Sequence, residues 1–336
     1  MNKIDLSIII PVFNTQDYIS DCLKSIMDAS LENVEIIIID DGSTDNSREI
    51  INEFSKNDKN ILYYFQENKG QGAARNRALK LAKGDYVYFM DSDDILNPNK
   101  FKEVFAIIKD EKLDAIFFDA ESFVDSEESN MDDFKNKFDY TRKHSHGYFS
   151  SGEKLFNSLS KEKKVFAPPW LYIIDRNVLL QNELRFPTKI KYEDEVFTMS
   201  LFFHLNTCRH ENKVVFRRRI RANSTMTSKI TIKSFEDMVK VFELLTLKFE
   251  DINFETSDAK IFYKKKLRNT YLTCLGLYHE INDVEGHDIY SNLKLIANKY
   301  SYFGLIGLFA TLNYSVFKAF QKSALFFRKF ISDIHR

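Results

Sequence analysis

The sequence of 336 residues is poor in the residues that mark several protein classes. Its only cysteines are Cys22, Cys208 and Cys274, an odd number at wide spacing. Such a set fits neither a disulfide framework nor a zinc site, and it indicates a reducing compartment. Ten glycines and five prolines are few for this length. This scarcity argues against a loop-rich or low-complexity chain.

An excess of positive charge is also missing. The chain has 48 Lys and Arg against 49 Asp and Glu, a net charge of −1, whereas a nucleic-acid-binding protein is usually basic. No glycine occurs before Gly42 and no Gly-Lys pair occurs anywhere. The first absence excludes a dinucleotide fingerprint after the first apolar run, and the second excludes a P-loop. NAD-dependent dehydrogenases and P-loop kinases therefore drop out.

The sequence also lacks an obvious leader and a long hydrophobic run. Residues 1–5 do not read as a signal peptide. The nearest approach to a spanning helix, the uncharged segment Ser301 to Phe317, is shorter and more polar than the ~20 apolar residues that such a helix needs. We therefore expect a cytoplasmic protein, either free or bound peripherally to the inner face of the cell membrane.

Short apolar runs recur through the first 120 residues. They begin 25 to 29 residues apart, at Leu6, Val34, Ile61, Tyr86 and Ala115, with helical periodicity between them. Runs that are apolar at every position are typical of strands buried on both faces of a parallel sheet. A spacing near ~30 residues is that of a strand–helix–strand unit. The pattern predicts an α/β fold in which helices cover both faces of a mainly parallel sheet.

The rest of the chain changes character twice. Residues 119–133 contain seven acids and no base, which indicates either a solvated loop or a lid that contacts a second substrate. From Ile232 onward proline is absent and apolar residues recur at helical spacing. We expect one domain over 1–230, with a first half at 1–118 and a second half at 119–230, followed by a helical region at 231–336.

The last segment, residues 300–336, is basic and amphipathic. It has five Lys and Arg against one acid, and its apolar residues repeat every three or four positions from Phe317 to Ile334. A basic helix with an apolar face fits an anchor on anionic lipid. The alternatives are packing on its own domain or a contact with a second copy of the chain.

Polar residues follow the predicted strands, at the edge where open parallel sheets bind ligands. Asp91-Ser92-Asp93-Asp94 follows the fourth run. Carboxylates at a strand end suit Mn²⁺ or Mg²⁺, which bind through one or two of them plus substrate phosphates; the alternative is a simple turn. The loop from Asn68 to Arg75 enters a helix and indicates either a phosphate-binding N-terminus or a glycine turn with a solvated arginine.

Six motifs in order resemble the family 2 glycosyltransferases with the GT-A fold. The resemblance covers roughly residues 4–225. The motifs are SIIIPVFN (Ser7 to Asn14), IIIDDGSTD (Ile37 to Asp45), ENKGQGAARNRAL (Glu67 to Leu79), GDYVYFMDSDDIL (Gly84 to Leu96), YEDEVF (Tyr192 to Phe197) and RIRANSTMT (Arg219 to Thr227).

The resemblance implies a role for individual residues. Asp41 matches the carboxylate that accepts the uracil N–H, and Phe13 stands where the family commonly has a stacking tyrosine. Asp93, with Asp91, matches the D-x-D ligands of a diphosphate-bound Mn²⁺ or Mg²⁺. The donor-site residues implied are Pro11, Phe13, Asn14, Asp41, Asn68, Arg75, Asp91, Ser92, Asp93, Arg219 and Arg221. For the last two, a solvated basic strand is the alternative.

Asp194 matches the family's catalytic base, and Glu193 beside it would contact the acceptor. Acids at 193–195 also suit the first turn of a helix, where the macrodipole favours them. Trp170 is the only tryptophan; it would serve either as a platform for an acceptor sugar or as a core residue.

The resemblance implies an inverting, metal-dependent hexosyltransferase that moves a sugar from a UDP-sugar to a hydroxyl of a glycan or lipid-linked acceptor. It would form a β-glycosidic bond in capsule, lipopolysaccharide or wall-polymer synthesis, and would bind no nucleic acid. Two alternatives are a non-catalytic carbohydrate-binding scaffold and a sugar nucleotidyltransferase. The second needs a basic, glycine-rich loop after the first strand, and this chain has Pro-Val-Phe-Asn-Thr-Gln-Asp there.

Overall fold

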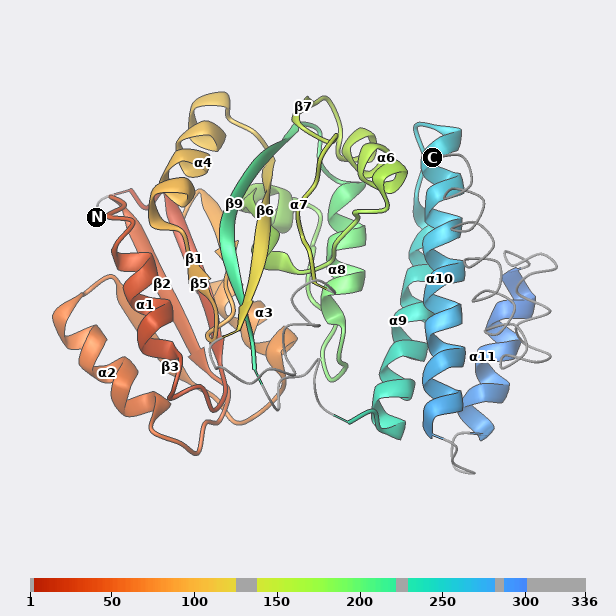
Figure 1. Ribbon diagram of the computed structural model, residues 1–336, viewed down its shortest axis with the longest axis horizontal. Coiled ribbons are helices and arrows are strands. Elements are labelled where there is room, and N and C mark those ends of the chain that lie inside the picture. The colour runs from red at the N-terminus through yellow and green to blue at the C-terminus, as the bar shows by residue number, and fades with distance from the viewer. Residues whose placement is uncertain (1–2, 125–137, 222–228, 282–286, 301–336) are drawn as a thin grey trace, which may run out of the picture. The chain divides into compact units, whose positions relative to one another are not determined.

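The computed structural model describes residues 3–124, 138–221, 229–281 and 287–300 (Figure 1). The chain divides into two compact units. The first consists of Met1–Ser228 with Phe254–Ala259, and the second of Lys229–Asn253 with Lys260–Arg336. Of the predicted basic tail (300–336) and the acidic segment (119–133), residues 301–336 and 125–133 lie outside the described residues.

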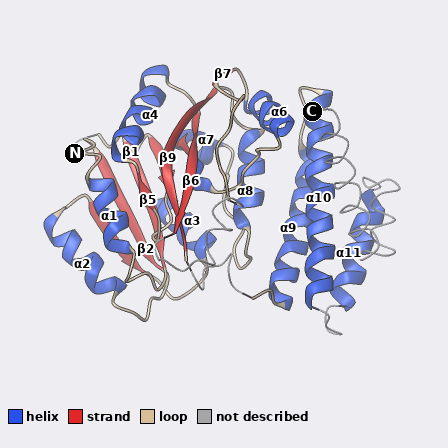
Figure 2. Ribbon diagram, viewed as in Figure 1, coloured by secondary structure: helices blue, strands red, loops and turns tan. Residues whose placement is uncertain are grey.

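The first unit is built on a nine-stranded sheet (Figure 2). The spatial order is β3-β2-β1-β4-β8-β6-β9-β5, and β7 pairs with β9. The strands are β1 (Leu6–Val12), β2 (Val34–Asp40), β3 (Ile61–Phe65), β4 (Tyr86–Phe89), β5 (Ile95–Leu96), β6 (Ala115–Val124), β7 (Gly147–Phe149), β8 (Tyr172–Asp175) and β9 (Cys208–Ile220).

All five predicted strands begin at the residue where the apolar run begins. β1, β2, β3 and β4 pair in parallel, as expected for strands buried on both faces. Beyond β4 the pairing changes, because β8 lies between β4 and β6 and is antiparallel to both. β6 therefore points the same way as β4 without pairing with it, and the sheet is mixed.

Helices lie on both faces of this sheet. Figure 1 shows α3 behind it, where it contacts β1 and β2, and α1 and α2 in front. The helices of the first unit are α1 (Ile19–Met27), α2 (Ser47–Asn57), α3 (Gln71–Leu81), α4 (Pro98–Glu111), α6 (Gly152–Glu162), the 3₁₀ helix η1 (Pro169–Leu171), α7 (Arg176–Gln181) and α8 (Glu193–Phe202). The described first unit has the mixed α/β sheet and covering helices of the predicted fold class.

The second unit is helical over its described residues, which confirms the predicted helical C-terminal region. Its helices are α9 (Ile232–Asp251), α10 (Ser257–Ile281) and α11 (His287–Tyr300). Thr231 starts α9 with a capping box, in which its side chain accepts from the Ser234 amide. The ring pairs Phe242–Tyr271 and Phe249–Tyr263 join α9 to α10.

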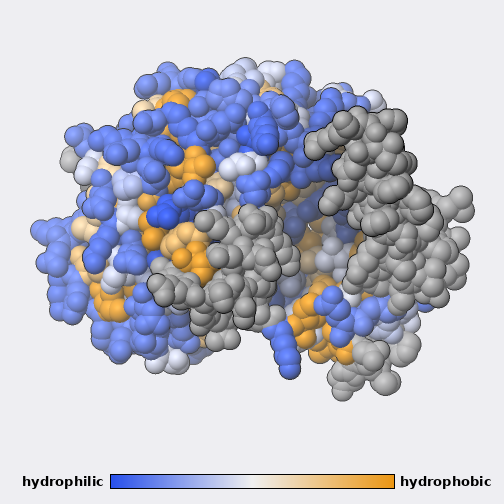
Figure 3. Space-filling model, in the orientation of Figure 1, coloured by the Kyte–Doolittle hydropathy of each residue, from blue (hydrophilic) through white to orange (hydrophobic). Residues whose placement is uncertain are grey.

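None of the helices in the described part of the chain is long and apolar enough to cross a membrane. Figure 3 shows one face on which hydrophilic residues predominate, with smaller hydrophobic patches between them. Scattered apolar residues of this kind are ordinary on a protein surface.

Candidate functional site

One edge of the sheet gathers the predicted site residues. β1, β2, β3 and β4 point the same way, and two antiparallel steps through β8 make β6 and its parallel partner β9 point that way too. Their carboxyl ends therefore meet at a single edge. This topology brings residues 91–94 together with residues 219–221, more than a hundred positions later.

At the β1 and β2 end of this edge, Asp41 organises a loop. Its buried carboxylate accepts hydrogen bonds from the Lys69 amide (2.8 Å), the Gly70 amide (2.8 Å) and Gln66 Nε2 (2.7 Å). Each carboxylate oxygen has more than one lone pair, so these contacts leave capacity for another donor. In this structure Asp41 holds the loop that contains the exposed Asn68.

The turn after β1 presents an open aromatic ring. Pro11 is buried within the strand, and Phe13, just past its end, is 48% exposed. Asn14 has left-handed backbone (φ 52°), and its side chain accepts from the Thr44 amide at 2.8 Å. These bonds fix the turn and leave the Phe13 ring accessible, as a stacking role requires.

Arg75 on α3 joins two acidic segments. Its guanidinium is 2% exposed and lies 2.7 Å from Asp91 Oδ1 and 2.7 Å from Glu193 Oε1. Burial opposes the charged form, but Asp91, Glu193 and Asp194 outweigh it and raise the pKa of Arg75. Burial also raises the pKa of Asp91 and of Glu193, and Arg75 opposes both shifts. The arginine predicted at the nucleotide thus lies between the D-x-D turn and α8.

The end of β9 supplies two more cations. Arg221 Nε donates to Asp93 Oδ2 at 2.8 Å, and Arg219 Nε donates to the Asp93 carbonyl oxygen at 2.9 Å. Both guanidinium groups lie over the Tyr18 ring, at 5.1 Å and 5.0 Å. This packing argues against the alternative of a solvated basic strand.

Asp94 is buried behind the turn. Burial, with Asp93 and Asp91 close by, raises its pKa well above the ordinary value, and it accepts from the Arg219 amide at 2.6 Å. Ser92 is buried beside it. The turn alternative also holds here, since the Asp94 amide donates to the Asp91 carbonyl oxygen at 3.4 Å. The turn is what presents Asp91 and Asp93.

The acids at 193–195 occupy the first turn of α8, after Tyr192 in left-handed backbone (φ 63°). Asp194 is half-buried, and its Oδ1 accepts from the Glu195 amide at 3.0 Å. Burial raises the pKa of Asp194 to about 7, Glu193 and Glu195 add to the shift, and Arg75 opposes it. The helix-start interpretation is confirmed. A raised pKa is also what a general base near neutral pH needs, and the catalytic role of Asp194 stays a prediction.

The described residues could bind a divalent cation only if groups from outside the protein supply the rest of its coordination shell. They contain no group of three or more His, Cys, Asp or Glu that could hold a metal ion. Asp91 and Asp93 each have one oxygen paired with arginine, and within the described chain no hydrogen bond reaches the other oxygen. Mg²⁺ and Mn²⁺ accept one or two carboxylates plus substrate phosphates, so these two residues fit.

Trp170 belongs to the core, and the acceptor-platform interpretation is wrong. It is 3% exposed. Its ring stacks on Phe216 at 4.3 Å with an interplanar angle of 8°, and it meets Tyr140 edge-on at 4.9 Å. A sugar cannot reach a ring that protein side chains enclose.

Sequence reasoning missed several residues at this edge. Gln71 Nε2 donates to Asp91 Oδ1 at 2.8 Å, and Tyr18 supports the two arginines. Arg218 donates to the Tyr140 hydroxyl at 2.8 Å and forms no ion pair with a described residue. Gln71 lies inside a quoted motif and Arg218 directly precedes the predicted Arg219, so their positions at the motifs could have indicated both. Nothing in the sequence singles out Tyr18.

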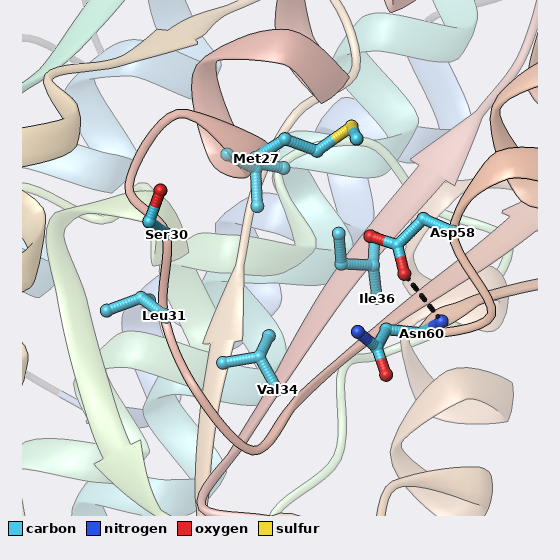
Figure 4. Close-up of a pocket in the computed structure, with 8 residues that line it drawn as sticks. Met27, Ser30, Leu31, Val34, Ile36, Asp58 and Asn60 are labelled. Atoms are coloured by element: carbon cyan, nitrogen blue, oxygen red, sulfur yellow. Dashed lines mark hydrogen bonds between the residues drawn. The ribbon is translucent and has the colours of Figure 1, made fainter.

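A pocket of about 230 Å³ lies at the opposite edge of the sheet (Figure 4). Val34 begins β2 there, and Asp58 accepts from the Asn60 amide just before β3. Met27, Leu31 and Ile36 give it apolar walls. It contains none of the predicted site residues.

The fold resembles that of solved glycosyltransferases. Residues 1–349 of S. aureus TarS in complex with UDP-GlcNAc superpose with a TM-score of 0.69 at 22% identity, over 86% of this chain and 79% of that one. The mannosyltransferase PcManGT from Pyrobaculum calidifontis, in complex with GDP-Man and Mn2+, gives a TM-score of 0.53 at 15% identity. It covers 94% of this chain and 89% of that chain. At these identities the likeness shows the fold, which is GT-A.

Sequence relatives agree with the fold. Glycosyltransferase GlyG of Streptococcus pneumoniae serotype 4 is 28% identical over 310 residues, which cover 86% of this chain and 95% of that protein. The poly(ribitol-phosphate) beta-glucosyltransferase of Bacillus spizizenii is 32% identical over 205 residues, 59% of this chain and 29% of the larger enzyme. The model of glycosyl transferase family 2 matches residues 7–192. With these motifs and this sheet edge, the chain belongs to glycosyl transferase family 2.

Proposed function

We propose that the protein is an inverting glycosyltransferase that moves a sugar from a UDP-sugar to a hydroxyl of a glycan or lipid-linked acceptor. It would form a β-glycosidic bond during synthesis of a capsule, lipopolysaccharide or wall polymer. One observation carries the proposal. At the carboxyl edge of the sheet, the pKa of Asp194 is raised to about 7, and the adjacent Glu193 pairs with Arg75, which also pairs with Asp91 of the D-x-D turn.

Asp194 is the base in this proposal. Its ionised carboxylate removes the proton from the acceptor hydroxyl as that oxygen attacks the anomeric carbon from the face opposite the leaving diphosphate. The C–O bond to the acceptor forms while the bond to the diphosphate breaks, so an α-linked donor becomes a β-glycoside. General-base catalysis contributes typically ~10²- to 10⁴-fold.

The diphosphate of the donor would be held by the D-x-D turn and the end of β9. Asp93 and Asp91 would hold Mn²⁺ or Mg²⁺, which supplies neutralisation of the charge that develops on the diphosphate. Arg219 and Arg221 add fixed positive charge beside Asp93. Phe13 and Asp41 line the end where a pyrimidine would stack and be hydrogen-bonded.

The UDP-sugar and polymer assignments draw on relatives. TarS has been solved with UDP-GlcNAc and with UDP, and the Bacillus spizizenii relative is named for glucosyl transfer to poly(ribitol-phosphate). These are properties of those proteins, and they support the same donor class and a surface polymer as acceptor for this chain.

The deciding experiment pairs a donor screen with one variant. The purified protein is incubated with a panel of UDP-sugars and candidate acceptors, and UDP release is measured for the wild type and for Asp194→Asn. We expect the variant to lose transfer by at least ~10²-fold while its Kd for UDP stays near that of the wild type. An Asp194→Asn variant that keeps most of its transfer rate would rule out Asp194 as the base.

A further inference from the structure

The Arg75 side chain is buried among other protein groups. Both terminal nitrogens are engaged at 2.7 Å, one by Asp91 and one by Glu193, and the guanidinium lies 5.1 Å from the centre of the Phe186 ring. The remaining nitrogen, Nε, is buried, and its N–H donates to no group within the described chain. A side chain that is 2% exposed and paired at both terminal nitrogens presents little donor surface to a nucleotide.

Further contacts join α3 to the segment that leads into α8. Asn76 Nδ2 donates to the Phe186 carbonyl oxygen at 2.8 Å, and its Oδ1 accepts from the Phe186 amide at 2.9 Å. At Gly72, an added Cβ would lie 2.5 Å from the Pro187 carbonyl oxygen and 3.1 Å from Glu193 Cγ. Helix α3 therefore packs against residues 186–193 too closely for a side chain at position 72.

At this junction one guanidinium is shared by two carboxylates. Glu193 is 8% exposed at its side chain, and Asp91 is 24% exposed. Removing one partner of a buried ion pair leaves an uncompensated charge that the protein must relax to solvate. Loss of Arg75 would leave the carboxylates of Asp91 and Glu193 without the cation that lies between them.

We propose that Arg75 is a positioning residue that ties the D-x-D turn at Asp91 to the start of helix α8, and so sets where the Asp194 carboxylate lies. In this proposal Glu193 is the residue of α8 that pairs with Arg75, and its role is this ion pair rather than the acceptor contact predicted from the sequence. The assignment rests on the proposed function in taking Asp194 as the base.

The first test is a double-mutant cycle of Arg75→Gln and Glu193→Gln, with Arg77→Gln as the control. Arg77 is on the same helix but donates to the Phe65 carbonyl oxygen. Misplacing a catalytic group by about 1 Å can cost ~10²-fold, so we expect each single variant to lower kcat by about 10- to 100-fold. The double variant should lose no more than about threefold beyond Arg75→Gln, since both changes break one contact. Losses that multiply would overturn the proposal.

The second readout separates positioning from simple destabilisation. Arg75 lowers the pKa of Asp194, whereas Glu193 raises it. The acid limb of the kcat/KM profile should therefore move to higher pH in Arg75→Gln and to lower pH in Glu193→Gln, while the Kd of Glu193→Gln for UDP with saturating Mn²⁺ stays within about threefold of the wild type. Acid limbs that stay in place, or a large loss of UDP affinity in Glu193→Gln, would contradict a positioning role.

A third measurement does not depend on transfer. In the full-length chain, hydrogen exchange should become faster over residues 186–196 in Arg75→Gln but not in Arg77→Gln, with α6 unchanged in both. If the wild type transfers no sugar from any UDP donor, the proposed function fails while this measurement still tests the tie. Unchanged exchange over 186–196 would overturn it.

Discussion

Asp194 illustrates how position in a helix and catalytic use can coincide in one residue. The groups that act on it are Glu193 and Glu195 on its own helix and Arg75 on α3, while Tyr172 on β8 and Tyr140 feel its charge. The acids and burial together outweigh the single arginine, so the carboxylate holds its proton up to near neutral pH.

This balance predicts the pH dependence of the reaction. A base must be ionised, so kcat/KM should be full above the raised pKa of about 7 and fall roughly tenfold per pH unit below it. A rate profile between pH 5 and 9, with UDP release as the signal, measures the midpoint. An acid limb near pH 4, the ordinary range of an aspartate, would contradict the shift; Asp17→Asn, on an exposed turn, is a suitable control.

Asp93 gives a prediction about the metal. Because Asp93 and Asp91 are the two carboxylates available at the turn, Asp93→Ala should abolish the dependence of UDP binding on Mn²⁺ or Mg²⁺. Calorimetric titration of UDP with and without the metal measures this directly. Equal wild-type activity in excess chelator would rule out the metal site.

Trp170 gives a prediction about stability. Truncating a buried tryptophan to alanine typically costs ~3–5 kcal/mol, and Trp170 is stacked on Phe216 inside the sheet unit. Trp170→Phe should cost much less and leave the KM for the acceptor unchanged, as read from urea melts and from acceptor titrations. A selective rise in that KM would restore the sugar-platform interpretation.

At the scale of elements, the local sequence predicts where strands begin but not how distant strands pair. Five strand starts coincide with the beginnings of five apolar runs, since a strand buried on both faces needs an uninterrupted run. The place of β8 could not be predicted: Tyr172–Asp175 is four residues long, and its pairing with β4 and β6 depends on the tertiary fold. In the same way, the motif order indicated Arg75 and Asp91, but not that Arg75 would face Glu193.

The start of α4 offers a test of this local control. Asn97 caps the helix by accepting from the Lys100 amide at 3.2 Å, and Pro98 occupies the first turn. Asn97→Ala should lower the free energy of unfolding by about 1 kcal/mol. The exposed Lys102→Ala in the same helix is the control and should change it by only a few tenths of a kcal/mol. Equal effects of the two substitutions would contradict the capping role.

At the scale of the whole molecule, the basic segment at 300–336 remains a prediction from its sequence. If it anchors the enzyme, full-length protein should bind liposomes with anionic lipid at low salt and be released as salt rises, whereas a chain ending at residue 299 should stay unbound. Sedimentation with vesicles measures this. Equal binding of the two chains would rule out the anchor, and a change in oligomer size on truncation would indicate a subunit contact.

The place of β8 also has a consequence for how the chain is made. β4 ends at Phe89 and pairs with β1 on one side, but its other neighbour, β8, is not complete until Asp175 has been synthesised. At ~5–20 residues per second, a ribosome needs about 4 to 17 seconds to cover that interval. During that time the β4 edge of an apolar parallel sheet is unpaired in the nascent chain, and an open edge of this kind pairs with other chains. Residues 1–118 made alone should therefore aggregate unless a chaperone covers that edge.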